Sequence, residues 1–143
     1  MAGKSPRRRA REFVIQGLYQ AQIAGQDAAA IQVQAEGVVG FDKIDRELYD
    51  ALLAETLAHM EAIKVDLAPF IDRPWDEVSP IERSILLLGA CELKLHLETP
   101  YRVIINEAIE LAKTYGGTDG HKFVNGVLDK LTPILRAAEF PQA

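Results

Sequence analysis

Residues 79 to 91 read SPIERSILLLGAC, and this stretch decides the fold class. Ser79 can cap a helix, Pro80 suits the first helical position, and Glu82 occupies the place from which a capping-box acid reaches back. The ILLLGAC that follows is apolar around the whole helical circumference. Because a helix that is hydrophobic on every face is surrounded by other helices, the stretch predicts a buried central helix.

Helix signals recur on both sides of this central helix, and no alternating strand pattern accompanies them. We expect further helices after Ser5-Pro6, from Asp27 to Gly37, from about Asp45 to Asp66, after Thr99-Pro100 and after Asp119, with breaks at Pro69 and Pro74. Short connections favour antiparallel neighbours. The sequence therefore predicts an all-α compact bundle of about six or seven helices. A chain of 143 residues suits one domain, spanning residues 1–143.

The composition excludes several classes of protein. It is 48% hydrophobic and 26% charged, as in soluble domains, and no stretch approaches the length of a membrane helix. The basic start is followed only by FVI before Gln16, which is too short for a signal peptide; an Arg-rich transit peptide is a weaker alternative because Glu12 falls within it. Cys91 is the only cysteine, which excludes an internal disulfide. We expect a cytoplasmic protein with no membrane partner.

The net charge of −5 conceals an asymmetry along the chain. Residues 1–25 carry +4, residues 26–98 carry −9 and residues 99–143 are balanced. A basic segment attracts a polyanion that an acidic body repels. The basic segment, residues 1–11, contains Arg7, Arg8, Arg9 and Arg11. Two interpretations stay open: a solvated chain end, or a contact with nucleic acid or an acidic protein.

No catalytic constellation is recognisable in the sequence. It contains no phosphate-binding glycine loop, nucleophile elbow or paired-histidine zinc motif, and its three histidines are scattered. Glu107 and Glu110 lie three apart on one helix, the spacing of a metal or acid/base pair. Asn106 and Glu110, however, lie on the solvent side, opposite the apolar stripe. We therefore expect neither enzyme activity nor a cofactor.

The start of the last helix, HKFVNG at residues 121–126, carries side chains that a core does not require. On a helical wheel Phe123 falls about 80° from the centre of the apolar stripe, Lys122 points away from it and Asn125 lies on its flank. Either Phe123 fills the core edge, or it stacks on a single-stranded base beside Lys122 and Asn125. We expect Asp119 to cap this helix, while its charge opposes a nearby phosphate.

Tyr19 is a candidate for a protein contact. It clusters with Arg8 and Glu12 on the face of the first helix opposite Val14 and Leu18. An exposed tyrosine among charged groups often marks an interface, although a single one is also common on ordinary surfaces.

Three stretches of the chain resemble the NusB (N utilization substance B) family of transcription antitermination factors. They are RRRARE near the start, QGLYQ shortly after it, and PYRVIINEAIELAKTYGGTDGHKFVNGVLDK at residues 100–130. Residues 25–78 carry little of the family's signature. The resemblance implies an all-helical RNA-binding fold and a role that is not enzymatic.

The resemblance also implies partners. Members of the family pair with NusE, a small-subunit ribosomal protein, and the pair binds the boxA element of nascent RNA. With other Nus factors and RNA polymerase, it suppresses premature termination, chiefly in ribosomal RNA operons. By similarity, the arginines of residues 1–11 and the HKFVNG helix start touch RNA. Asp119 takes an acidic position that restrains affinity, and Tyr19 and Glu82 belong to the NusE-facing surface.

Two other functional classes compete with this interpretation. A similar domain precedes the catalytic part of a family of ribosomal RNA methyltransferases, but we expect no catalytic domain after Ala143. The other class is a purely structural interaction protein that uses an acidic helical surface and does not contact RNA. Binding to boxA RNA, with and without NusE, separates an antitermination factor from the structural class.

Overall fold

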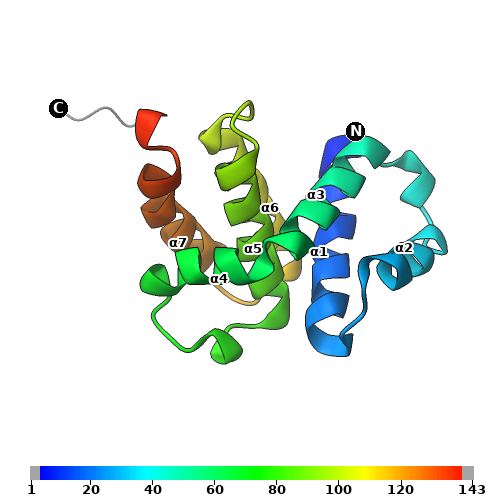
Figure 1. Ribbon diagram of the computed structural model, residues 1–143, viewed down its shortest axis with the longest axis horizontal. Coiled ribbons are helices and arrows are strands. Elements are labelled where there is room, and N and C mark those ends of the chain that lie inside the picture. Colours follow the sequence, from blue (N-terminus) through cyan, green and yellow to red (C-terminus); the bar gives the residue numbers. More distant parts are fainter. Residues whose placement is uncertain (1–3, 140–143) are drawn as a thin grey trace. The chain divides into compact units, whose positions relative to one another are not determined.

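The structure is a computed structural model that describes residues 4–139. These residues form seven α-helices and no strand, which confirms the predicted all-α class. The helices are α1 Pro6–Ala24, α2 Ala28–Glu36, α3 Arg46–Ala58, α4 Met60–Leu67, α5 Pro80–Leu95, α6 Tyr101–Tyr115 and α7 Gly120–Leu135 (Figure 1). Short 3₁₀ turns lie at Phe41–Lys43, Ala68–Phe70, Trp75–Glu77 and Ala137–Glu139.

The chain packs as two compact units, residues 1–58 and 59–143. In the first unit, α1 packs against α2 and α3. Gly17 permits this close approach, because a Cβ there would lie 2.8 Å from Cγ2 of Ile31 and 3.1 Å from Cδ1 of Leu53. A single domain over residues 1–143 stays a prediction.

The second unit is built around α5, as SPIERSILLLGAC predicted. Helix α5 packs against α4, α6 and α7, and all its residues from Ser84 to Leu93 are buried. Ser79 caps it by accepting a hydrogen bond from the backbone N–H of Glu82 at 3.3 Å. A Cβ on Gly89 would lie 2.9 Å from Cδ1 of Leu128, so the glycine lets α7 approach α5 closely.

The single helix expected from about Asp45 to Asp66 is wrong, because the chain forms two helices there. Helix α3 ends at Ala58 and α4 begins at Met60, with His59 between them at φ −108° and ψ 12°. Thr56 and Ile63 are both buried, so the apolar stripe continues across the break. Hydrophobic periodicity therefore did not reveal the break between the two helices.

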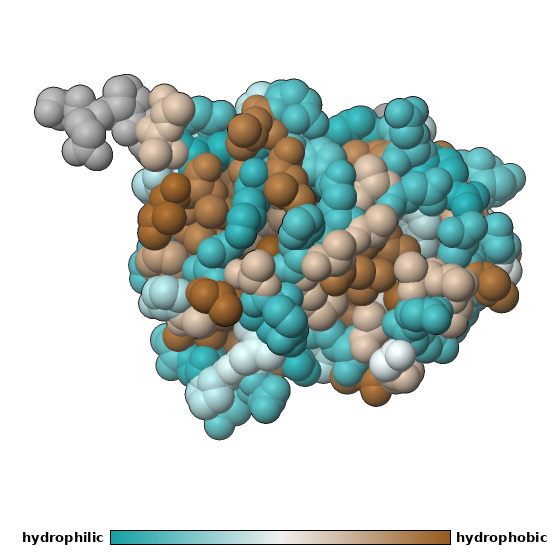
Figure 2. All heavy atoms as spheres, in the orientation of Figure 1, coloured by the Kyte–Doolittle hydropathy of each residue, from teal (hydrophilic) through white to brown (hydrophobic). Residues whose placement is uncertain are grey.

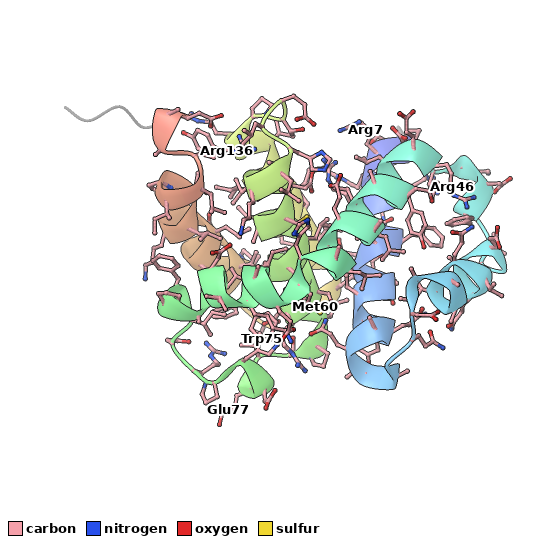
Figure 3. The ribbon with its side chains drawn as sticks, in the orientation of Figure 1. Arg7, Arg46, Met60, Trp75, Glu77 and Arg136 are labelled. Carbon is pink, nitrogen blue, oxygen red and sulfur yellow. The ribbon has the colours of Figure 1, made fainter. Side chains whose placement is uncertain are left out.

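Arg136, just beyond α7, connects the C-terminal end of α7 to that of α5 through hydrogen bonds. Arg136, labelled in Figure 3, is buried and only 3% exposed. The guanidinium donates hydrogen bonds to the carbonyl oxygens of Leu93 (2.6 Å), His96 (2.8 Å), Thr99 (3.0 Å) and Glu92 (3.2 Å), and to Oε1 of Glu139 (3.0 Å). The last carbonyls of a helix have no partner within it, so Arg136 caps the C-terminal end of α5.

The surface is mixed in character. Figure 2 shows apolar residues among hydrophilic ones on the face in view, and the most exposed apolar side chains are those of Val39, Val65 and Val33. None of the helices formed by residues 4–139 is long and apolar enough to cross a membrane.

Candidate nucleic-acid interface

The arginine-rich segment is helical rather than extended. Ser5 accepts a hydrogen bond from the backbone N–H of Arg8 at 3.0 Å, and Pro6 occupies the first position of α1. Of the predicted basic arm at residues 1–11, positions 6–11 therefore belong to α1, and residues 1–3 lie outside the described part of the chain.

Three of the four arginines are accessible at the start of α1. Arg7 is exposed and its Nη1 lies 3.7 Å from Oδ2 of Asp45 (Figure 3). Arg8 and Arg9 are half-buried, and Nε of Arg9 donates to the carbonyl oxygen of Lys4 at 3.3 Å. Such contacts at a surface are weak. Arg7 and Arg9 can therefore exchange these contacts for phosphate oxygens.

Arg11 does not share this accessibility. The residue is 3% exposed, and it precedes the buried Val14 and Ile15 by three and four positions. Residues at this spacing share one face of a helix. Arg11 thus lies on the packed face of α1, where RNA has little access to it, and its contact with RNA stays a prediction. The spacing to Val14 and Ile15 was a signal that the charge pattern obscured.

Asp119 begins the last helix in a way that differs from the prediction. It is the N-cap residue, but its backbone is left-handed (φ 62°) and its side chain makes no capping hydrogen bond. Instead, its Oδ1 lies 3.4 Å from Nζ of Lys122, and the two side chains are 65% and 72% exposed. The expected side-chain cap is therefore wrong. Asp119 partly neutralises the exposed lysine at the start of α7.

Phe123 lies at the edge of the core, as its place on the helical wheel indicated. Its side chain is half-buried, whereas the neighbouring Val124 is fully buried. The guanidinium carbon of Arg73 lies 4.5 Å from the centroid of the Phe123 ring. Lys122 is exposed and Asn125 is half-buried. The predicted residues of this helix start thus present a cation, an aromatic ring and an amide within its first two turns.

Glu82 explains the glycine cluster that precedes α7. Its Oε2 accepts a hydrogen bond from the backbone N–H of Gly117 at 3.0 Å. A Cβ on Gly120 would lie 2.6 Å from the same oxygen, and one on Gly116 would lie 3.2 Å from it. The GGTDG loop needs glycines because it closes around a buried carboxylate. Glu82 therefore holds this loop, and the expected capping-box role is replaced by that contact.

We predict that Gly120→Ala lowers the free energy of unfolding by about 1–3 kcal/mol, because the new methyl group displaces the carboxylate of Glu82 from Gly117. Chemical denaturation measures the change. In a Glu82→Ala background the same substitution should cost clearly less, since the clashing oxygen is absent. Equal costs in both backgrounds would contradict this role of Glu82.

The two predicted partner-binding residues differ in exposure. Tyr19, in the first unit, is 38% exposed and available for contact. Glu82, in the second unit, is 9% exposed. A partner thus has limited access to the Glu82 side chain, and its influence on such a partner would pass through the loop that it holds.

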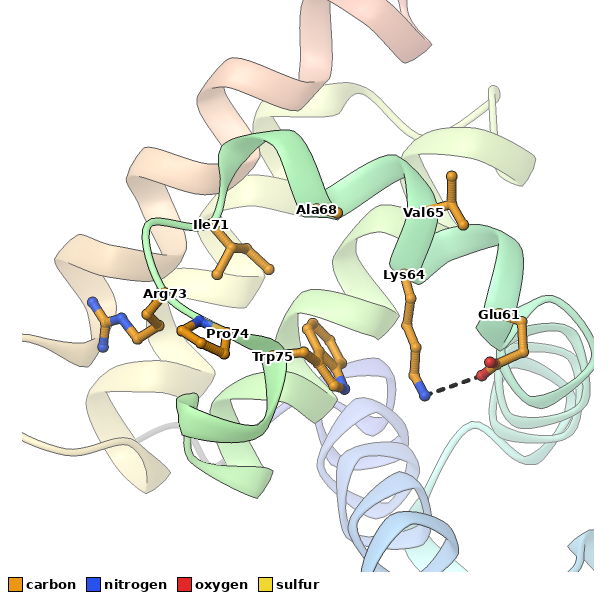
Figure 4. A pocket seen from close by; sticks show the side chains of 8 residues that line it. All are labelled: Glu61, Lys64, Val65, Ala68, Ile71, Arg73, Pro74 and Trp75. Carbon is orange, nitrogen blue, oxygen red and sulfur yellow. Dashed lines mark ion pairs between the residues drawn. The ribbon is translucent and has the colours of Figure 1, made fainter.

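A groove of about 430 Å³ lies beside α4 in the second unit (Figure 4). Its lining residues are Glu61, Lys64, Val65, Ala68, Ile71, Arg73, Pro74 and Trp75. Lys64 and Glu61 form an ion pair at 3.0 Å. The lining contains no histidine, cysteine or serine. Within residues 4–139, no group of three or more potential metal ligands gathers.

The fold and these surfaces define an all-α protein with accessible arginines at the start of α1 and a cation–aromatic cluster at the start of α7. Residues 8–133 match the NusB family. The chain belongs to that family.

Individual relatives agree with this assignment. The chain is 57% identical to the transcription antitermination protein NusB of Aromatoleum aromaticum over 139 residues, which are 97% of this chain and 96% of the relative. A solved structure of T. maritima NusB has a TM-score of 0.81 at 27% identity, covering 96% of this chain and 99% of that one. A crystal structure of antitermination factors NusB and NusE in complex with dsRNA shares the fold, with a TM-score of 0.74 at 24% identity over 89% of this chain and 96% of that one.

Proposed function

We propose that this chain is a transcription antitermination factor that binds boxA-containing RNA together with NusE and promotes complete transcription of ribosomal RNA operons. It acts in the cytoplasm, within a complex of other Nus factors and RNA polymerase, and it neither catalyses a reaction nor uses a cofactor. Membership of the NusB family supports this role. The observation that carries it is the exposed Lys122 next to the half-buried Phe123, whose ring lies against the guanidinium of Arg73, at the start of α7.

The two units contribute different parts of the binding in this proposal. In the first unit, Arg7, Arg8 and Arg9 contact phosphates, which position the RNA without reading its sequence. In the second unit, an unpaired base stacks at the Phe123 ring and the guanidinium that lies against it. Lys122 and Asn125 contact the same nucleotide. Tyr19 contacts NusE directly. Glu82 contributes to the NusE surface through the GGTDG loop that it holds. Both units together act as one RNA-binding domain over residues 1–143.

A transcription assay with purified components tests the proposed function. The template carries boxA upstream of a terminator, and the reaction contains RNA polymerase, NusE and the other Nus factors. Adding this chain should increase read-through on the boxA template and leave a template with scrambled boxA unchanged. Equal read-through with and without the chain would contradict the proposal.

We predict that Asp119→Asn tightens RNA binding at low salt by up to about five-fold, the range expected for an exposed charge effect. The substitution removes a charge that repels phosphate and releases Lys122 from its ion pair. Asparagine accepts the left-handed backbone found at position 119, so stability should change little. Titration of boxA RNA at several salt concentrations measures the effect, which should fade as salt rises.

Asp129→Asn is the matched control, because Asp129 is an exposed aspartate on the same helix, about three turns further along. It changes the net charge equally but should leave RNA affinity close to that of the parent. An unchanged affinity of Asp119→Asn at low salt, or an equal gain in both variants, would place the RNA elsewhere.

A further inference from the structure

Arg73 reaches the candidate RNA site from a distant part of the sequence. It lies between the 3₁₀ turns Ala68–Phe70 and Trp75–Glu77, fifty residues before Phe123. Figure 4 shows its side chain pointing away from Trp75 and the groove. Its guanidinium carbon is 4.5 Å from the centroid of the Phe123 ring. The residue is nevertheless exposed, so the arginine covers part of the ring while remaining accessible itself.

Arg73 has more N–H donors than its contact with Asp72 uses. Its Nε donates to Oδ1 of Asp72 at 2.9 Å. This hydrogen bond lowers the pKa of Asp72, and the charge of Lys130 acts in the same direction. The hydrogen bond to Asp72 raises the pKa of Arg73, and the negative charges of Glu82 and Glu77 raise it further. An exposed ion pair of this kind contributes little, and a guanidinium has five N–H donors. It can hold Asp72 through Nε and still donate to a phosphate.

We propose that Arg73 is an RNA-contacting residue: its guanidinium, stacked on Phe123, carries an unpaired base of the RNA and donates to the adjoining phosphate. This inference rests on the proposed function and adds to it a residue that the sequence did not indicate. Guanidinium planes stack on bases as aromatic rings do. The order of groups is then Phe123, Arg73 and the base, so Phe123 supports the base through the arginine.

The opposite role for Arg73 makes a different prediction. If the arginine only covered the ring, a base would have to displace it before stacking on Phe123. Removing the arginine would then uncover the ring and tighten binding. If the arginine carries the base, its removal weakens binding. The sign of the change therefore decides between the two roles.

The test is titration of single-stranded boxA RNA against the parent chain, Arg73→Ala and Arg73→Lys over a range of salt concentrations. Arg73→Ala should weaken binding about 5- to 100-fold, the cost expected for losing one stacked base. It should also reduce the salt slope by about 0.7, the value for one phosphate contact on a single strand. Arg73→Lys should keep the slope but recover only part of the affinity, because it retains the charge and lacks the planar group.

Arg46→Ala supplies a matched control. Arg46 is also exposed, lies 4.9 Å from the ring centroid of Phe41 and pairs with Asp50 at 3.0 Å (Figure 3). Removing it deletes the same charge and the same kind of contact in the first unit, outside the proposed site. Its RNA affinity should equal that of the parent, and thermal melting should show that both alanine variants remain folded.

The outcomes separate this inference from the proposed function. Unchanged or tighter RNA binding by Arg73→Ala overturns the inference, and it leaves the proposed function standing if Phe123→Ala still weakens binding. A loss of NusE binding with intact RNA binding also overturns it, because Arg73 would then face the protein partner. If the parent chain with NusE does not prefer boxA over scrambled RNA, the proposed function itself fails.

Discussion

Arg136→Met should lower the free energy of unfolding by about 3–5 kcal/mol, the largest stability loss that we expect from a single substitution in this chain. Methionine keeps much of the side-chain volume but supplies no donor. The substitution removes the five hydrogen bonds of the guanidinium. The carbonyl oxygens at the end of α5 then lose a charged donor in a place where water reaches poorly. Denaturant unfolding measures the loss.

Two further variants sharpen this test. Arg136→Lys retains the positive charge but cannot reach all of these oxygens at once, so it should recover only part of the stability. Arg102→Met removes an exposed arginine from the same unit, and it should change stability by less than about 0.5 kcal/mol. If Arg136→Met were as stable as Arg102→Met, the capping role of Arg136 would be wrong.

Replacing Arg7, Arg8 and Arg9 together with alanine should weaken RNA binding on the order of 100-fold at low salt. This estimate takes roughly 1 kcal/mol for each lost contact with a charged group. Because phosphate contacts carry no sequence information, boxA and scrambled RNA should lose affinity alike. The salt slope should fall by about 2, which corresponds to three phosphates on a single strand. Titrations at four or more salt concentrations give both quantities.

The control for this variant replaces three exposed cations outside the proposed surface, Lys43, Arg46 and Arg102. It changes the net charge of the chain by the same amount. If the effect of the α1 arginines were only long-range attraction, the two triple variants would bind alike. An unchanged salt slope in the α1 variant would show that these arginines do not touch RNA.

Local sequence signals predicted most helices well, but they missed the break that separates α3 from α4. Ser5 and Ser79 both cap helices where the sequence indicated, since a cap depends on residues three positions apart. The break at His59 was missed because buried residues recur with helical spacing on both sides of it. Hydrophobic spacing reports which face is buried, and it is insensitive to a break that preserves that face.

The sequence indicates which candidate-site residues lie together when they are neighbours in the chain, but not when they are far apart in it. Lys122, Phe123 and Asn125 share one helix start, so a helical wheel placed them. Arg73 meets Phe123 only through tertiary packing, and no spacing rule joins positions fifty apart. The contact of Glu82 with Gly117 was also not predicted, because this hydrogen bond joins residues that are thirty-five positions apart.

Buried arginines were the other difficulty. Arg11 and Arg136 are each 3% exposed, although arginine is mostly found at surfaces. A run of basic residues suggests one shared role. Within α1, however, helical geometry divides the run into accessible side chains and one on the packed face. The charge pattern alone therefore did not distinguish the buried Arg11 from the accessible arginines beside it.

The most direct measurement is an equilibrium titration of boxA RNA and a scrambled RNA of equal composition, each against this chain with and without NusE. We predict that the chain with NusE prefers boxA by about ten-fold or more, as expected if at least one base is read by hydrogen bonds to its edge. We also predict that omitting NusE weakens boxA binding. Equal affinity for the two RNAs, unaffected by NusE, would contradict the account.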